Sequence, residues 1–222
     1  MTNKILHMKK DKINKIFEVF SEKNPKPVTE LEFENDYTLL TAVTLSAQST
    51  DVQVNKATKK LFEKVKGPDA MVRLGKAGLK KHINTIGLYN SKAKNVINMS
   101  KILLEKHGGK VPIDFDKLVE LPGVGRKTAN VFLNCGHGYP VIGVDTHVFR
   151  VANRLGIIKA KNVLKAELDL PKKIPKKWMV DAHHWMILHG RYVCKAKKPE
   201  CDNCLVKDLC DYFKKPFFVA KP

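Results

Sequence analysis

Four of the five cysteines in this 222-residue chain fall within one short segment, CKAKKPECDNCLVKDLC. Cys194, Cys201, Cys204 and Cys210 form a C-x6-C-x2-C-x5-C array. Four thiolates at this spacing can close on a tetrahedral metal ion or on an iron–sulfur cubane, and the spacing alone does not separate zinc from iron–sulfur. Disulfides are the third alternative, which the expected reducing compartment disfavours. Cys135 lies outside the array, and we expect it to be a small buried apolar residue.

A second chemistry-bearing stretch is LPGVGRKTAN, which spans residues 121–130. Gly123 and Gly125 permit the tight turn that the stretch predicts between two short helices. Exposed N–H groups at the start of the second helix form a site for an anion such as a DNA phosphate, and Arg126 adds positive charge beside it. An ordinary helix–helix turn is the alternative.

Lys127 lies in the first turn of that second helix, which is an unusual place for a lysine. The positive end of the helix dipole disfavours an ammonium ion there and favours the neutral amine. A neutral lysine amine is a nucleophile that attacks electrophilic carbon and forms Schiff bases. The alternative is a lysine that only reaches for phosphate.

Helical periodicity dominates the elements that must position these groups, so the sequence predicts an all-α protein. An amphipathic helix is expected over the first 20 residues. Asn35 and Asp36 are plausible caps of a following apolar helix, Ser91 is a plausible cap of the helix that ends at Gly108, and Asp145 or Thr146 caps the helix of VDTHVFRVANRLG.

The charge balance points to a polyanion as partner. The chain has 41 Lys and Arg against 22 Asp and Glu, which gives a net charge of +19. Nucleic acid is the first candidate and an anionic membrane surface the second. Lysine-rich codon usage is the alternative, since only 5 of the 41 basic residues are Arg. No run approaches the roughly 20 apolar residues that span a bilayer, and the N-terminus shows no secretory signal, so we expect a cytoplasmic protein, nucleoid-associated if bacterial.

LPGVGRKTAN followed by VDTHVFRVANR resembles the helix-hairpin-helix plus Gly/Pro-Asp signature of the DNA glycosylase superfamily. LSAQSTD, TIGLYNSKAKN and HHWMILHGRYVC resemble segments of its endonuclease III family, in the same order. The resemblance covers the chain from about Phe17 to Tyr212.

This resemblance implies a bifunctional DNA glycosylase and apurinic/apyrimidinic lyase of base excision repair. Lys127 occupies the position of the family's nucleophile and Asp145, 145 − 127 = 18 positions later, that of its essential aspartate. The implied substrates are oxidised pyrimidines, such as thymine glycol, and the implied product is a strand cleaved 3′ to the site by β-elimination. Members that only excise a base lack this lysine. A helix N-cap is the alternative role of Asp145.

The resemblance also implies the fold, the cofactor and the DNA contacts. Two helical lobes are expected, one of residues 29–139 and one of 1–28 plus 140–222, with DNA in the cleft between them and a [4Fe–4S] cluster on the cysteine array. Gln48 and Leu88 match residues that plug and wedge the duplex, although a surface glutamine and a core leucine are the ordinary alternatives. Independently of the resemblance, a loop clamped at both ends by cysteine ligands would present its lysines as a rigid basic surface, and the turn offers its anion site. The residues expected to contact DNA are therefore Gln48, Leu88, Gly123, Gly125, Arg126, Lys195, Lys197 and Lys198.

The expected partners are duplex DNA with oxidised pyrimidines or abasic sites and, transiently, downstream repair enzymes, with the protein acting as a monomer. Three rivals stay open: a monofunctional glycosylase for another lesion, a non-catalytic helix-hairpin-helix binding module, and an iron–sulfur electron carrier. Asp51, Tyr89 and His147 are near the expected pocket without assigned roles. The tail with Phe217 and Phe218 is unexplained.

Overall fold

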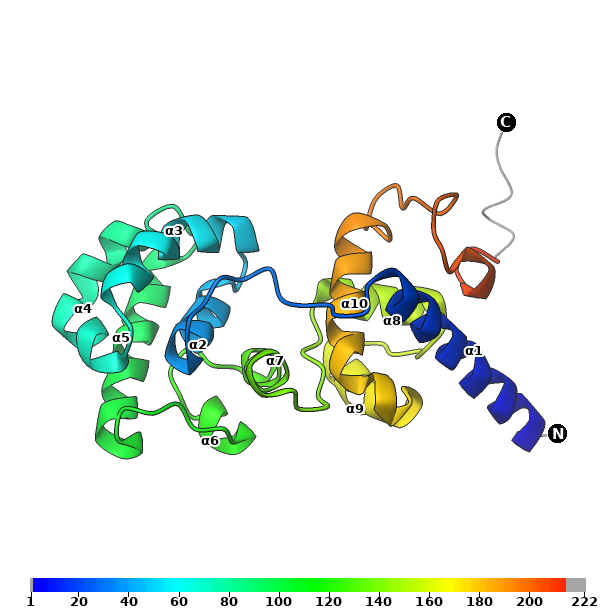
Figure 1. Ribbon diagram of the computed structural model, residues 1–222, viewed down its shortest axis with the longest axis horizontal. Helices are drawn as coiled ribbons and strands as arrows, with labels where there is room; N and C mark the ends of the chain where they lie inside the picture. Colours follow the sequence, from blue (N-terminus) through cyan, green and yellow to red (C-terminus); the bar gives the residue numbers. More distant parts are fainter. Residues whose placement is uncertain (1, 215–222) are drawn as a thin grey trace. The chain divides into compact units, whose positions relative to one another are not determined.

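The computed structural model describes residues 2–214, with side chains from residue 10 onward (Figure 1). Within these residues the regular structure is helical and no strand occurs, so the predicted all-α class is confirmed. Contacts along the chain divide it into two compact units, Thr29–Gly138 and Met1–Val28 with Tyr139–Pro222. That residues 29–139 and 1–28 plus 140–222 fold as separate domains stays a prediction. The C-terminal tail with Phe217 and Phe218 lies outside the described residues.

The unit Thr29–Gly138 is built around one helix that is buried along nearly its whole length. Every residue of α2 from Tyr37 to Leu45 is buried, and α2 contacts α3, α5 and α7. Asn35 caps α2 through a capping box with Thr38, as its residue type predicts. The helices of this unit are α2 Asp36–Leu45, α3 Asp51–Lys64, α4 Pro68–Ile83, α5 Tyr89–His107, α6 Phe115–Val119 and α7 Arg126–His137.

The longest pair in this unit is α4 with α5, which lie side by side (Figure 1). α4 breaks at Gly75, whose φ of 70° and ψ of 170° are not helical. The prediction that Ser91 caps α5 is wrong. The helix starts at Tyr89, because Leu88 takes a left-handed conformation and turns the chain into the helix without a side-chain cap. Its end at Gly108, also left-handed, is as predicted.

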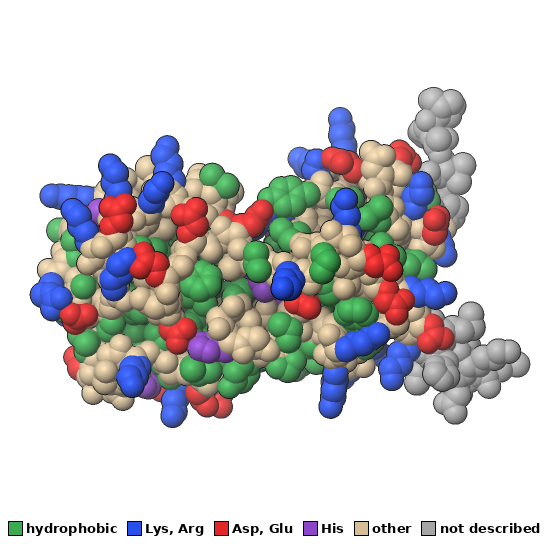
Figure 2. All heavy atoms as spheres, in the orientation of Figure 1, with side chains coloured by type: hydrophobic (Ala, Val, Ile, Leu, Met, Phe, Trp, Pro, Cys, Tyr) green, Lys and Arg blue, Asp and Glu red, His purple; other side chains and the backbone are tan. Residues whose placement is uncertain are grey.

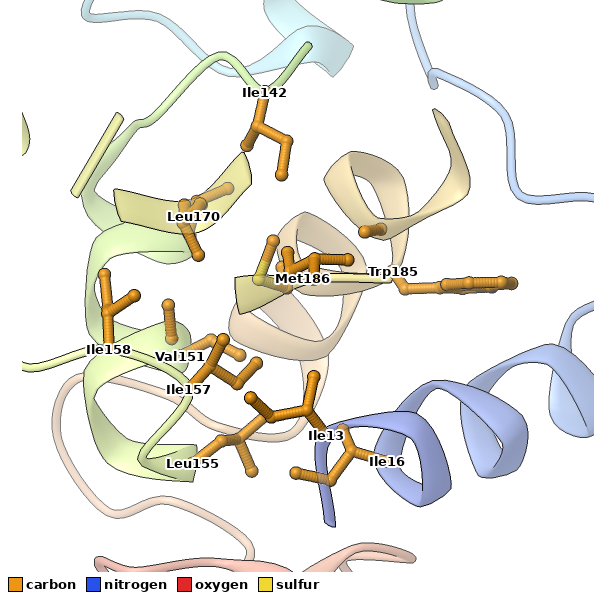
Figure 3. Packing of buried hydrophobic residues seen from close by; sticks show 14 of the residues in the cluster. Ile13, Ile16, Ile142, Val151, Leu155, Ile157, Ile158, Leu170, Trp185 and Met186 are labelled. Atoms are coloured by element: carbon orange, nitrogen blue, oxygen red, sulfur yellow. The ribbon is translucent and has the colours of Figure 1, made fainter. Parts of the chain in front are cut away.

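In the other unit, α1 contributes to one buried apolar cluster together with three helices from the C-terminal half of the chain. Figure 3 shows Ile13 and Ile16 of α1 close to Leu155 of α8, with Met186 of α10 in the same cluster. The apolar face of the amphipathic helix predicted at the N-terminus is therefore part of the core, at Ile13, Ile16, Phe17 and Phe20. The helices of this unit are α1 Thr2–Lys23, α8 Thr146–Leu155, α9 Val163–Lys173 and α10 Met179–Tyr192, with short 3-10 turns at η1 Lys176–Trp178 and η2 Lys207–Leu209.

A close contact between α8 and α10 fixes the geometry of this unit. Gly190 of α10 is buried, and a Cβ there would lie 2.8 Å from the Cβ of His147 on α8. Any larger residue would push the two helices apart. Since Asp145 is the N-cap of α8 and α10 leads into the cysteines, this contact joins two of the predicted sites within one unit.

Candidate active site and cluster-binding segment

The predicted helix-hairpin-helix is present as α6, a turn and α7. Leu121 N donates to Leu118 O at 3.1 Å, Val124 N to Leu121 O at 3.0 Å, and Ala129 N to Gly125 O at 3.0 Å. These bonds carry the chain from one helix into the next. The N-cap of α7 is Gly125, which has no side chain to accept from the first N–H groups of the helix. The start of α7 therefore presents backbone donors of the kind that bind phosphate.

Gly123 is required by the turn for two reasons. Its φ is 84°, a left-handed conformation that other residues adopt at a cost. A Cβ there would also lie 2.9 Å from Asn95 Cβ and 3.2 Å from Thr44 Cγ2. The turn thus lies directly against α5 and α2. Gly125 differs, since its φ is −91° and a Cβ there would meet nothing within 4 Å.

The two basic residues after the turn are both exposed. The Arg126 guanidinium lies 4.9 Å from the ring centroid of Phe115, so it bridges α7 to α6 by a cation–π contact. Lys127 is the second residue of α7 and lies in its first turn. This exposed residue lies at the mouth of the helix that presents the phosphate-binding donors.

Gln48 and Leu88 lie on neighbouring segments of the same unit. A Cβ on Gly87 would lie 3.6 Å from the carbonyl oxygen of Gln48, which is ordinary van der Waals contact. Both side chains are exposed, and Leu88 has 59% of its surface accessible. The exposure of Leu88 excludes the ordinary alternative of a core leucine. The exposure of Gln48 does not separate a DNA contact from an ordinary surface glutamine. Insertion into DNA stays a prediction.

Asp145 is the N-cap of α8, as its residue type predicts. Its Oδ1 accepts from the backbone N–H of Val148 at 2.8 Å, and the side chain is half-buried. The cap fixes the direction of the carboxylate at the start of α8. Lys127 belongs to one compact unit and Asp145 to the other. Their joint action in catalysis stays a prediction.

The four cysteines of the array line a common cavity together with His189 and Tyr212. None of them forms a disulfide. Burial, and then the thiolate charges of Cys194 and Cys210, raises the pKa of the Cys201 thiol. The cysteine side chains are thus close enough to interact electrostatically. The iron of a bound cluster would supply the positive charge that keeps them deprotonated. In the described part of the chain, no group of three His, Cys, Asp or Glu side chains has the geometry of a single-ion site.

The backbone around the array is held by arginines that sequence reasoning did not single out. Arg154 Nη1 donates to Lys195 O at 2.8 Å and its Nη2 to Ala196 O at 3.1 Å. Arg150 Nε donates to Cys194 O at 2.9 Å. The sequence does contain a signal for these two residues. The chain has only five arginines among its many lysines, and two of them, Arg150 and Arg154, lie four positions apart on α8. Arginine is favoured where a planar fork of donors must reach several acceptors.

The lysines between the first two cysteines are all exposed. Glu200 N donates to Val193 O at 3.0 Å and closes the segment at its base. Lys195 pairs with Glu200 at 2.5 Å, so part of its charge is already compensated. Lys197 and Lys198 carry the remaining positive charge of the segment, and Lys198 has a φ of 50°.

Comparison with protein families identifies the hairpin and the cysteine array separately. The profile described as "HhH-GPD superfamily base excision DNA repair protein" matches residues 41–176. The profile described as "Iron-sulfur binding domain of endonuclease III" matches residues 194–210, which begin and end at the first and last cysteines of the array.

Curated relatives match over nearly the full chain. Endonuclease III of Rickettsia conorii is 57% identical over 201 residues, which cover 90% of this chain and 96% of the relative. Endonuclease III of Escherichia coli strain K12 is 54% identical over 208 residues, which cover 94% and 99%.

Solved structures share the fold at high coverage. A non-covalent endonuclease III–DNA complex matches with a TM-score of 0.88 at 44% identity, covering 94% of this chain and 98% of that one. A trapped endonuclease III–DNA covalent intermediate matches with a TM-score of 0.86 at 44% identity, covering 92% and 97%. A thermostable thymine-DNA glycosylase, 24% identical, shares the fold alone, with a TM-score of 0.78.

Proposed function

Because the chain belongs to the endonuclease III family of base excision repair DNA glycosylases and carries a [4Fe–4S] cluster, we propose that it is a bifunctional glycosylase and lyase whose cysteine array holds that cluster. The observation that carries the proposal is an accessible lysine, Lys127, in the first turn of the helix that follows the hairpin. The solved relative trapped as a covalent intermediate with DNA supports an enzyme nucleophile in this family.

Recognition starts with the phosphate backbone. The backbone donors at the start of α7 and the exposed lysines Lys197 and Lys198 bind phosphates without reading sequence. The damaged nucleotide is then turned out of the duplex, and Gln48 and Leu88 fill the gap that it leaves. We infer oxidised pyrimidines as the bases removed, duplex DNA as the partner, and a monomer as the working form that hands its product to downstream repair enzymes.

The chemistry proposed is displacement at the sugar C1′. The Lys127 amine forms a bond to C1′ while the bond from C1′ to the base nitrogen breaks, and the base leaves with its electron pair. Asp145 stabilises the positive charge that develops on the sugar and accepts the proton from the attacking amine.

Strand cleavage follows from the same covalent bond. The sugar ring opens to a protonated Schiff base of Lys127, which acidifies the C2′ proton. Loss of this proton and cleavage of the bond from C3′ to its phosphate oxygen break the strand on the 3′ side. Water then hydrolyses the imine and regenerates the amine of Lys127.

A nicking assay tests the proposal. We expect a duplex with one thymine glycol to lose the base and to be cleaved without added alkali. Base release without a nick would indicate a monofunctional glycosylase, and binding without base release would indicate a helix-hairpin-helix module without catalysis. Nicking of an abasic duplex but not of thymine glycol would keep the lyase chemistry and overturn the proposed lesion.

A further inference from the structure

A buried lysine lies beneath the segments that carry Gln48 and Leu88. Lys92 is the fourth residue of α5, and only 5% of its surface is exposed. Its Nζ donates to Ser49 Oγ at 3.0 Å. The ion pairs formed by described residues do not include Lys92, so its ammonium is buried without a carboxylate.

This position is unfavourable for a cation. Burial lowers the pKa of Lys92, and the first turn of a helix disfavours positive charge. An apolar side chain of similar length would avoid both costs. The lysine is therefore not explained by the stability of the fold, and the bond to Ser49 is what distinguishes it from a methionine at the same place.

Lys92 holds both neighbouring segments at once. Its backbone N–H donates to Leu88 O at 3.0 Å, which closes the turn that carries Leu88. Its side chain reaches Ser49, the residue directly after Gln48. Gln48 and Leu88 both have positive φ, 56° and 59°, and each needs surrounding contacts to hold that conformation.

We propose that Lys92 is a positioning residue that fastens the Gln48 segment to the Leu88 turn, so that both side chains enter the duplex as one preorganised unit. The inference rests on the proposed function, since it assigns Lys92 a part in base extrusion. If the segments moved independently, their ordering would add to the free-energy cost of unstacking a base. Lys92 removes that added cost before DNA binds.

Three variants test the proposal. Lys92→Met removes the donor while keeping the length of the side chain, and Ser49→Ala removes the acceptor. Lys94→Met is the matched control, because Lys94 is an exposed lysine on the same helix. Each protein is tested on a thymine glycol paired with adenine and on an abasic site, which has no base to extrude. A 2-aminopurine next to the lesion reports extrusion by its fluorescence, independently of bond cleavage.

We expect Lys92→Met to slow both base release and the fluorescence rise about tenfold on the paired lesion, and to change abasic-site cleavage by less than about twofold. Ser49→Ala should act in the same direction, and the double variant should be no slower than Lys92→Met, because both remove one interaction. Lys94→Met should match the wild type.

Equal losses on both substrates, or additive effects of the two substitutions, would overturn the proposal. So would an unchanged fluorescence rise in Lys92→Met. Should Lys92→Met fail to fold, as judged by circular dichroism, Ser49→Ala decides alone. Equal losses on both substrates, or an unchanged fluorescence rise in Ser49→Ala, would then overturn the proposal. A wild-type protein that extrudes the base without cleaving would count against the proposed lyase chemistry, while the fluorescence would still test Lys92.

Discussion

Gln48, Leu88 and Lys198 are the non-glycine residues with positive φ in the described part of the chain. Such conformations cost on the order of 1 kcal/mol or more each, and they persist only where the surrounding structure holds them. The resemblance to the endonuclease III family predicts Gln48 and Leu88 as DNA contacts, and the loop between two cysteine ligands predicts Lys198. Neither prediction refers to the backbone conformation. Residue type alone would have placed Leu88 in the core. The family resemblance was therefore needed to predict an exposed Leu88, and its exposure in the structure is consistent with that prediction.

The two hairpin glycines should respond differently to alanine. Gly123→Ala combines a φ of 84° with a Cβ at 2.9 Å from Asn95, so we expect it to lower the free energy of unfolding by about 2 kcal/mol or more. Gly125→Ala should change it by less than about 1 kcal/mol, because its φ is −91° and the space is open. Chemical denaturation of both variants measures the difference. Equal destabilisation would contradict the role assigned to Gly123.

At the scale of elements, residue type predicted the start of a helix correctly only where the helix is capped by a side chain. Asn35 and Asp145 are caps as expected, but Ser91 is not, since a left-handed Leu88 starts α5 by backbone geometry that residue type does not reveal. The helix α9 has no counterpart among the helices predicted from the sequence. Its segment contains Pro171, which is tolerated here near the C-terminal end of the helix but obscures the helical pattern. Tertiary packing of Ala166 and Leu170 on the core stabilises it.

The cysteine segment has little regular structure, so we expect the bound cluster to maintain the conformation of the segment. Its only helical turn is η2, Lys207–Leu209. Cys201→Ser should abolish the visible absorbance of the cluster and weaken duplex binding roughly tenfold, since Lys197 and Lys198 would no longer be held in a fixed geometry and one charge-assisted bond contributes about 1.5 kcal/mol.

The far-ultraviolet circular dichroism of Cys201→Ser should be nearly that of the wild type. Cys135→Ser is the control. Cys135 lies in the other compact unit, on α7, so cluster absorbance and DNA affinity should both persist. A Cys201→Ser protein that binds DNA as tightly as the wild type would show that the cluster does not order the lysine segment.

For the whole molecule, the net charge of +19 predicts a nucleic-acid partner but not the binding surface. Basic side chains on the visible face are interspersed with acidic ones over both units (Figure 2). Composition therefore does not locate the nucleic-acid-binding surface, which has to be inferred from local structure. Among the described residues, none of the helices has the length and apolar character of a membrane span.

The salt dependence of duplex binding separates specific phosphate contacts from a general lysine excess. Replacing Lys197 and Lys198 by alanine should reduce the slope of log K against log salt by about 1.8, which is about 0.9 for each phosphate that a lysine no longer neutralises. Lys59 and Lys60, exposed on α3, form the control pair and should leave the slope nearly unchanged. Equal slopes for both double variants would favour lysine-rich codon usage as the origin of the charge.

The most direct test of the proposed chemistry is to trap and locate the covalent bond. The protein is incubated with a thymine glycol duplex and borohydride, which reduces a Schiff base to a stable amine, and the adduct is digested and mapped by mass spectrometry. We predict one adduct, on the peptide that contains Lys127, absent from Lys127→Ala and strongly diminished in Asp145→Asn. An adduct on another residue, or one that persists undiminished in Lys127→Ala, would contradict the assignment of Lys127 as the nucleophile.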